Sequence, residues 1–172
     1  RMTALRALHE AETGGPLSIL IGTILSARTR DENTSPVVKK LFTRYKTAHA
    51  LAKAKVSDVE KIIKPTGFYH VKARRIIKVA SLIDSQYSGK VPDSFDELLK
   101  LPGVGRKTAN CVLVYAFDKP AIPVDTHVHR ISNLLGWVHT NSPEETEKEL
   151  IKILPKKYWS ETNRLFVSIG QK

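Results

Sequence analysis

The chain has 172 residues, of which 41% are hydrophobic, and its formal net charge is +11. This hydrophobic content is typical of a folded globular protein and excludes a disordered chain. The 28 lysines and arginines, against 17 acidic residues, are spread along the sequence and do not form one tail. Such a basic surface attracts polyanions, most commonly nucleic acid, although a basic protein kept soluble by charge repulsion has the same composition.

A single cysteine, Cys111, excludes an intramolecular disulfide and fits a reducing compartment. Because it lies in an apolar stretch, we expect it to be buried as a small hydrophobe. The longest apolar run, residues 17–25, is shorter than the about 20 residues that cross a bilayer. No secretory signal is visible. These features predict no membrane partner.

Almost every segment has the periodicity of an α-helix, and the residues between segments are typical of helix ends. Ser35-Pro36 is interpreted as an N-cap followed by a first-turn proline. Three serine–glutamate pairs fit capping boxes: Ser57 with Glu60, Ser94 with Glu97, and Ser142 with Glu145. Glycines 67, 89 and 136 stand where helices are expected to end. With no alternating strand pattern, the sequence predicts an all-α fold of roughly nine or ten short helices.

The helices are expected to form two lobes. Residues 16–135 are assigned to one barrel-like helical domain, which contains a helix-hairpin-helix segment at about 95–117. The stretch after Gly136 is expected to fold back onto the opening helix, so that residues 1–15 and 136–172 make the second lobe.

The most distinctive local feature is the glycine turn Leu101-Pro102-Gly103-Val104-Gly105 between two predicted helices. Its glycines permit positive φ angles and the close approach of another backbone. Gly105 is expected to open the second helix, whose free N–H groups and positive dipole end form an anion site, while Val104 packs inward. The turn therefore predicts a contact with a DNA phosphate. The alternative is a tight turn that only joins two core helices.

Arg106 and Lys107 fall in the first turn of that helix, where a cation is disfavoured by roughly 0.3–1 kcal/mol. Cations at a helix end that disfavours them, beside a glycine turn, indicate functional residues. Arg106 is expected to meet a phosphate. The helix end and the neighbouring guanidinium favour the neutral amine of Lys107, which is a nucleophile. Two phosphate-binding cations are the alternative.

Further along the chain, Asp125 directly precedes another helical pattern and is interpreted as its N-cap. His127 and His129 stand two positions apart, so on a helix they face different ways and make a poor metal-binding pair. We therefore predict no metal site in this segment.

Taken together, these motifs resemble the endonuclease III family of helix-hairpin-helix DNA glycosylases. Residues 101–110, Leu-Pro-Gly-Val-Gly-Arg-Lys-Thr-Ala-Asn, carry the resemblance with Val-Asp-Thr-His at 124–127. Residues 25–31, Leu-Ser-Ala-Arg-Thr-Arg-Asp, and 67–73, Gly-Phe-Tyr-His-Val-Lys-Ala, are similar to two further family segments. The resemblance implies a two-lobed all-α fold with the active site in the cleft between the lobes.

The resemblance also implies a base excision repair enzyme with glycosylase and AP-lyase activity on oxidised pyrimidines in duplex DNA. The damaged nucleotide is flipped into the cleft, where Lys107 attacks the deoxyribose C1′ beside the Asp125 carboxylate. A Lys107 Schiff base then leads to β-elimination, which cuts the strand on the 3′ side. The DNA-binding residues that the resemblance implies are Leu101, Gly103, Val104, Gly105, Arg106, Thr108, Arg28, Phe68, His70, Lys72 and His127.

Three positions depart from the family pattern. Arg28 stands where the family has a glutamine that fills the space left by the flipped base, Phe68 stands in place of a leucine wedge, and His70 replaces an asparagine. An aromatic wedge can still stack in the gap. The alternatives are a core role for Phe68 and a phosphate contact for Arg28.

A fourth departure concerns the cofactor. Family members carry four cysteines after the last helix, which bind a [4Fe–4S] cluster, whereas this sequence has Cys111 alone. We therefore expect these 172 residues to bind no metal or cofactor. The cluster is expected only if the native chain continues past Lys172, and the presence of Arg1 before Met2 favours a truncated chain.

Three other functions remain open at this point: a mono-functional mismatch or alkylation glycosylase, a non-catalytic helix-hairpin-helix DNA-binding module, and a helical protein-interaction domain. The expected partner is double-stranded DNA that contains damaged bases or abasic sites. The protein is expected to be a monomer that is cytoplasmic and nucleoid-associated, or nuclear in a eukaryote.

Overall fold

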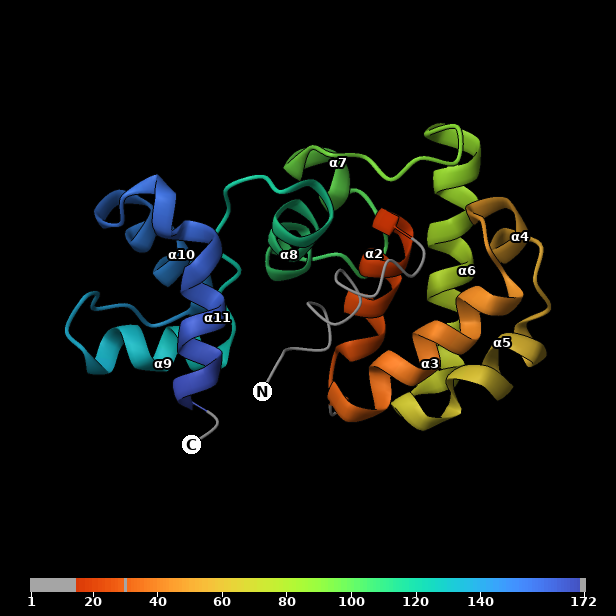
Figure 1. The fold of residues 1–172 in the computed structure, drawn as a ribbon, viewed down its shortest axis with the longest axis horizontal. Helices are drawn as coiled ribbons and strands as arrows, with labels where there is room; N and C mark the ends of the chain where they lie inside the picture. The colour runs from red at the N-terminus through yellow and green to blue at the C-terminus, as the bar shows by residue number, and fades with distance from the viewer. Residues whose placement is uncertain (1–14, 30, 171–172) are drawn as a thin grey trace.

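The computed structural model describes residues 15–29 and 31–170, and within them it contains α- and 3-10 helices and no strand. This confirms the predicted all-α fold. The helices form two groups, which Figure 1 shows with α2 to α8 on the right and α9 to α11 on the left. Their bounds are α2 Gly15–Ser26, α3 Asp31–Arg44, α4 Ala48–Ala52, α5 Val56–Ile63, η1 Lys64–Thr66, α6 Tyr69–Gln86, α7 Phe95–Leu99, α8 Arg106–Phe117, α9 Thr126–Leu134, α10 Pro143–Ile153, η2 Lys156–Tyr158 and α11 Trp159–Gly170.

The first lobe is built around α2. Every residue of this helix from Leu17 to Leu25 is buried, as expected for a helix that is apolar on all sides. It packs against α3, α6 and α8, and Figure 1 shows it between α8 and the α3–α6 group. The opening helix expected before Gly15 lies outside the described residues. Burial of α2 therefore fixes the position of α8, the helix that begins with Arg106.

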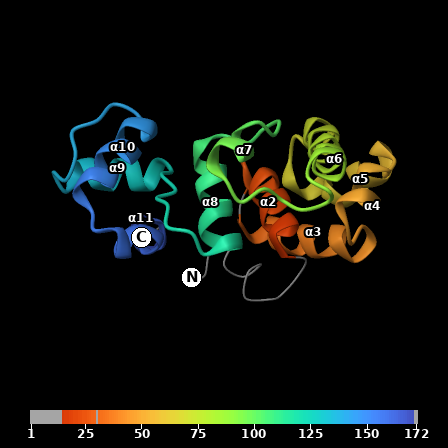
Figure 2. The same cartoon turned by 90° about the horizontal axis from the view of Figure 1, so that it is seen from above.

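The second lobe has its own hydrophobic core, formed where α9 packs against α10 and α11. Its buried members run from Ile122 to Phe166 and include Val128 and Leu150. Figure 2 shows this lobe beside α8, joined to it by the segment after Phe117. The second core thus begins before the boundary that we expected at residue 135, because α9 contributes its apolar face to α10 and α11.

The predicted helix ends were only partly right. Ser94 and Ser142 cap α7 and α10 by accepting hydrogen bonds from the N–H groups of Glu97 and Glu145, which confirms two capping boxes. Ser57 does not cap α5, because this helix already begins at Val56 and Lys55 occupies the N-cap position.

The start of α3 also differs from the prediction. Ser35 is not an N-cap, since α3 already begins at Asp31 and Pro36 lies inside it. Thr34 is buried, so the turn before the proline packs into the protein. Packing of this turn outweighs the local preference of proline for the first turn of a helix.

Helices α7 and α8 form the predicted helix-hairpin-helix segment. Leu101 and Val104 are buried and hold the turn, and the Val104 N–H donates to the Leu101 carbonyl over 3.1 Å. Gly103 has a φ of +79°, which glycine adopts without steric cost. A Cβ at Gly103 would lie 2.2 Å from Cδ of Arg75, so the turn also packs closely against α6.

We predict that Gly103→Ala lowers the free energy of unfolding by about 1–2 kcal/mol, because an L side chain is strained in the left-handed region. Gly105→Ala is the matched control: Gly105 has a negative φ of −97° and open space around its Cα. Urea titration of both variants measures the difference. Equal losses would contradict a special requirement for glycine at Gly103.

Candidate active site

The N-terminal end of α8 presents backbone donors to solvent. Gly105 is the N-cap, with extended backbone and no side chain to accept from the first N–H groups. The first turn of α8 holds no acidic residue. Nothing lies within 4 Å of the position where a Cβ of Gly105 would be. Free N–H groups, a positive helix end and this open approach together make an anion site.

The charges of Lys107 and Asp125 both act on the Cys111 thiol. The Cys111 thiol is buried, and burial raises its pKa, while the Lys107 ammonium opposes this effect and the Asp125 carboxylate adds to it. Lys107 and Cys111 are four residues apart and so share one face of α8. Asp125 arrives from the start of α9 in the second lobe. The two predicted catalytic residues therefore come from different lobes, and both lie near enough to Cys111 to act on its charge.

Two local interactions position Asp125. The buried Asn110 amide donates to the Ile122 carbonyl over 3.3 Å, which ties α8 to the segment leading into α9. Oδ1 of Asp125 accepts from the N–H groups of His127 and Val128 at 3.0 and 2.9 Å, which confirms the predicted N-cap. Capping fixes the carboxylate with respect to α9 and leaves Oδ2 available for other partners.

Arg106 joins the two lobes. Its Nε and Nη2 donate to the two carboxylate oxygens of Glu147 on α10 at 3.0 and 2.9 Å, and its guanidinium lies 4.8 Å from the ring centre of Phe95. Glu147 is buried, and the pair raises the pKa of Arg106. Arg106, which we expected at a phosphate, thus directs two of its donors into a bidentate ion pair within the protein.

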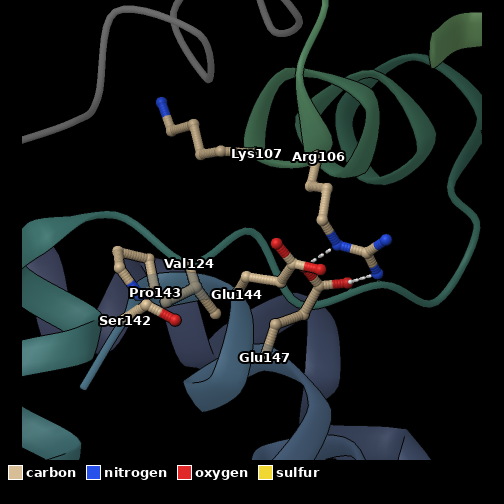
Figure 3. A pocket seen from close by; sticks show the side chains of 7 residues that line it. All are labelled: Arg106, Lys107, Val124, Ser142, Pro143, Glu144 and Glu147. Atoms are coloured by element: carbon tan, nitrogen blue, oxygen red, sulfur yellow. Dashed lines mark hydrogen bonds and ion pairs between the residues drawn. The ribbon is translucent and has the colours of Figure 1, made fainter. Parts of the chain in front are cut away.

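A pocket of about 330 Å³ lies beside this pair, between the start of α8 and the start of α10. Lys107 and Val124 line one part of it, and Ser142, Pro143 and Glu144 line another. Figure 3 shows the Lys107 side chain extending away from the Arg106–Glu147 pair. No carboxylate in the described part of the chain forms an ion pair with Lys107, and its amine lies within hydrogen-bonding reach of the buried Cys111 thiol.

The predicted wedge residues are exposed. Phe68 is 65% exposed with a φ of +47°, and Arg28 is exposed with a φ of +56°. Exposure excludes the core role considered for Phe68. The exposed His70 ring pairs with Glu60 over 2.8 Å, so part of its hydrogen-bonding capacity is already used.

Other predicted DNA-binding residues are placed differently. Lys72 is buried and directs all its donors into the protein, so it cannot reach a phosphate. The side chains of Leu101 and Val104 are also buried and support the turn from within. Thr108 is half-buried in the first turn of α8, and His127 is half-buried in the first turn of α9.

Sequence reasoning missed Glu147 and Asn110. Glu147 shares the buried face of α10 with Thr146 and Leu150, and an acidic residue on an otherwise buried helix face was the available signal. Asn110 is a buried amide in the apolar stretch of α8. Both act through partners that are remote in sequence.

The described residues hold no cluster of three or more histidine, cysteine or acidic side chains that fits a metal ion. The one cysteine of the sequence is buried against Ile19, so these residues do not fit a cluster held by four thiolates. Within residues 15–29 and 31–170, no helix is both long and apolar enough to cross a bilayer.

Residues 21–156 match the model of a protein family described as HhH-GPD superfamily base excision DNA repair protein. This match spans most of both lobes and includes the hairpin, Lys107 and Asp125. The fold and site thus define the chain as a helix-hairpin-helix protein of base excision DNA repair.

The chain is 55% identical to endonuclease III of Thermotoga maritima over 157 residues, which are 91% of this chain and 74% of that protein. It is 41% identical to endonuclease III of Bacillus subtilis, over 91% of this chain and 72% of that one. Its structure superimposes with a TM-score of 0.84 on a trapped endonuclease III–DNA covalent intermediate, at 44% identity and over 89% and 72% of the two chains. The chain belongs to the endonuclease III family.

We predict that Glu147→Gln lowers the free energy of unfolding by about 1–3 kcal/mol, because a charged hydrogen-bonded pair at a buried position is broken. Glu149→Gln is the matched control, since Glu149 pairs with Lys152 at the exposed surface of the same helix and such pairs contribute little. Thermal and urea unfolding measure both variants. A Glu147 variant as stable as the control would contradict the role of the pair in joining the lobes.

Proposed function

We propose that Lys107 is the nucleophile of a base excision repair DNA glycosylase with AP-lyase activity, and that Asp125 is its acidic partner. Membership of the endonuclease III family makes the chain a glycosylase and AP lyase that acts on DNA. The observation that carries the assignment of roles is that Lys107 lines a pocket between two separately packed lobes together with Val124, the residue that precedes Asp125.

The chemistry suits this geometry. The Lys107 amine forms a bond to C1′ while the glycosidic bond breaks, and the base leaves with the bonding electrons and takes up a proton. The attached nitrogen then loses one proton, the C1′–O4′ bond of the sugar ring breaks, and O4′ takes up a proton, which leaves a protonated Schiff base between C1′ and Lys107. Loss of a C2′ proton then breaks the C3′–O bond, so the 3′ phosphate leaves. Asp125 stabilises the positive charge that develops on the sugar in the first step.

The DNA substrate is inferred from how a damaged base reaches Lys107. A base within a duplex is not accessible to the cleft, so the damaged nucleotide must leave the stack. The N–H groups beside Gly105 hold a backbone phosphate, and Arg28 and Phe68 project from the first lobe to fill the gap in the duplex. We assign oxidised pyrimidines and abasic sites in duplex DNA as substrates of a monomeric enzyme. A cytoplasmic, nucleoid-associated location, or a nuclear one in a eukaryote, is part of the same proposal.

The first test traps the covalent intermediate. Wild-type protein incubated with a duplex containing thymine glycol or an abasic site, in the presence of borohydride, should give a protein–DNA adduct. Lys107→Gln should give none, because no other amine is held at C1′. The exposed Lys90→Gln is the control for the loss of one positive charge and should trap like wild type.

A wild-type protein that releases the base without any adduct would instead be a mono-functional glycosylase. DNA binding without turnover of any lesion would indicate a non-catalytic module. An adduct that persists in Lys107→Gln would contradict the assignment of the nucleophile.

Asp125→Asn separates the charge of this residue from its capping role. Asparagine caps a helix about as well as aspartate, so we expect a change in unfolding free energy below about 0.5 kcal/mol. We expect the single-turnover rate of base release to fall about 100- to 1,000-fold, because the charge that stabilises the sugar cation is lost. Asp125→Ala should show the same loss of rate and also lose about 1 kcal/mol of stability with the cap. A normal rate in Asp125→Asn would show that the carboxylate serves only as a cap.

A further inference from the structure

We propose that Lys72 is a positioning residue that locks together the two loops carrying Arg28 and Phe68, and so determines how these side chains enter the DNA. The inference rests on the proposed function, because it assigns Arg28 and Phe68 to the gap left by the flipped nucleotide. It assigns to Lys72 a role that needs no contact with DNA.

The Lys72 ammonium has three protein partners from two separate segments. Nζ donates to the Leu25 carbonyl over 2.8 Å, to Thr29 Oγ1 over 2.7 Å and to the Thr66 carbonyl over 2.7 Å. Three donors and three acceptors leave no N–H of the ammonium for solvent or phosphate. Lys72 is 5% exposed, so these bonds are formed in a protected environment.

The two segments are also bonded directly to each other. The Thr29 hydroxyl donates to the Thr66 carbonyl. Within the second segment, the Lys72 backbone N–H donates to the Phe68 carbonyl over 3.0 Å, at the start of α6. Thr29 follows Arg28 in sequence, and Thr66 is separated from Phe68 by Gly67 alone. The loop after α2 and the turn before α6 therefore meet at Lys72, in the lower part of the first lobe in Figure 1.

Both loops hold a non-glycine residue in the left-handed region, Arg28 at φ +56° and Phe68 at φ +47°. Such conformations persist only where the surrounding structure enforces them, and they concentrate at functional sites. The hydrogen bonds of Lys72 supply that enforcement on both sides. Without them, each loop can relax to an ordinary backbone conformation that points its exposed side chain elsewhere.

Burying a lysine in this position costs free energy, which argues that its role is more specific than filling space in the core. Burial lowers the pKa of Lys72, and the nearby Arg75 guanidinium lowers it further. A buried cation is tolerated where its hydrogen bonds are complete. The ammonium satisfies the carbonyls of Leu25 and Thr66, which would otherwise lack this donor. The lysine is therefore suited to holding these two carbonyls at one point.

The experiment compares two substrates. A duplex with thymine glycol needs both the Lys107 amine and the filling of the gap, whereas a single-stranded abasic oligonucleotide needs the amine alone. Lys72→Met should lower the single-turnover rate on the duplex on the order of 10- to 100-fold. It should leave borohydride trapping on the single strand within about twofold of wild type, because Lys107 lies on α8 and not on either loop that Lys72 bonds. Lys78→Met, an exposed lysine on the same helix, is the matched control.

A second measurement separates positioning from general stability. In an Arg28→Ala/Phe68→Ala background, Lys72→Met should reduce the duplex rate by no more than about twofold further, because the residues it positions are already gone. If Lys72→Met does not fold, Thr29→Val removes one partner of the ammonium and should give a smaller loss with the same selectivity for the duplex.

Equal losses on duplex and single strand, an additive loss in the double-alanine background, or no loss in the folded variant would each overturn the proposal. Failure of the proposed function looks different, because the wild-type protein itself would then form no adduct on either substrate.

Discussion

The bidentate ion pair between Arg106 and Glu147 is the interaction on which the geometry of the site depends. Each lobe has its own hydrophobic core, so burial of apolar surface holds each lobe together without fixing one against the other. The ion pair, with the Asn110–Ile122 hydrogen bond, connects α8 to the second lobe. Lys107 follows Arg106 on α8 and Asp125 follows Ile122 by three residues, so both catalytic candidates are positioned by this connection.

The ion pair also explains how two cations are accommodated at the start of a helix. The positive end of α8 disfavours both Arg106 and Lys107. Glu147 offsets the charge of Arg106, and Glu144 contributes in the same direction. Lys107 is left without a comparable partner among the described residues and faces the cleft. The same helix end favours a phosphate nearby.

Sequence patterns predicted the features that depend on neighbouring residues. The α7–α8 hairpin, the caps at Ser94, Ser142 and Asp125, and the burial of Val104 all follow from short-range rules. The partners of Arg106 and Lys72 did not follow, because they lie 41 and up to 47 residues away. Arg106 was therefore assigned to a phosphate, and Lys72 to DNA binding, where the folded chain uses both side chains internally. The start of α3 was also mispredicted, because packing of Thr34 outweighed the local signal of Pro36.

The central claim is that one amine, that of Lys107, becomes covalently bonded to the deoxyribose. The most direct measurement is to reduce the complex with borohydride on an abasic duplex, digest it with nuclease and protease, and locate the remaining sugar by mass spectrometry. The account predicts a single modified peptide, with the added mass on Lys107. Modification of another lysine or of the chain N-terminus, in a sample where Lys107 is unmodified, would contradict it.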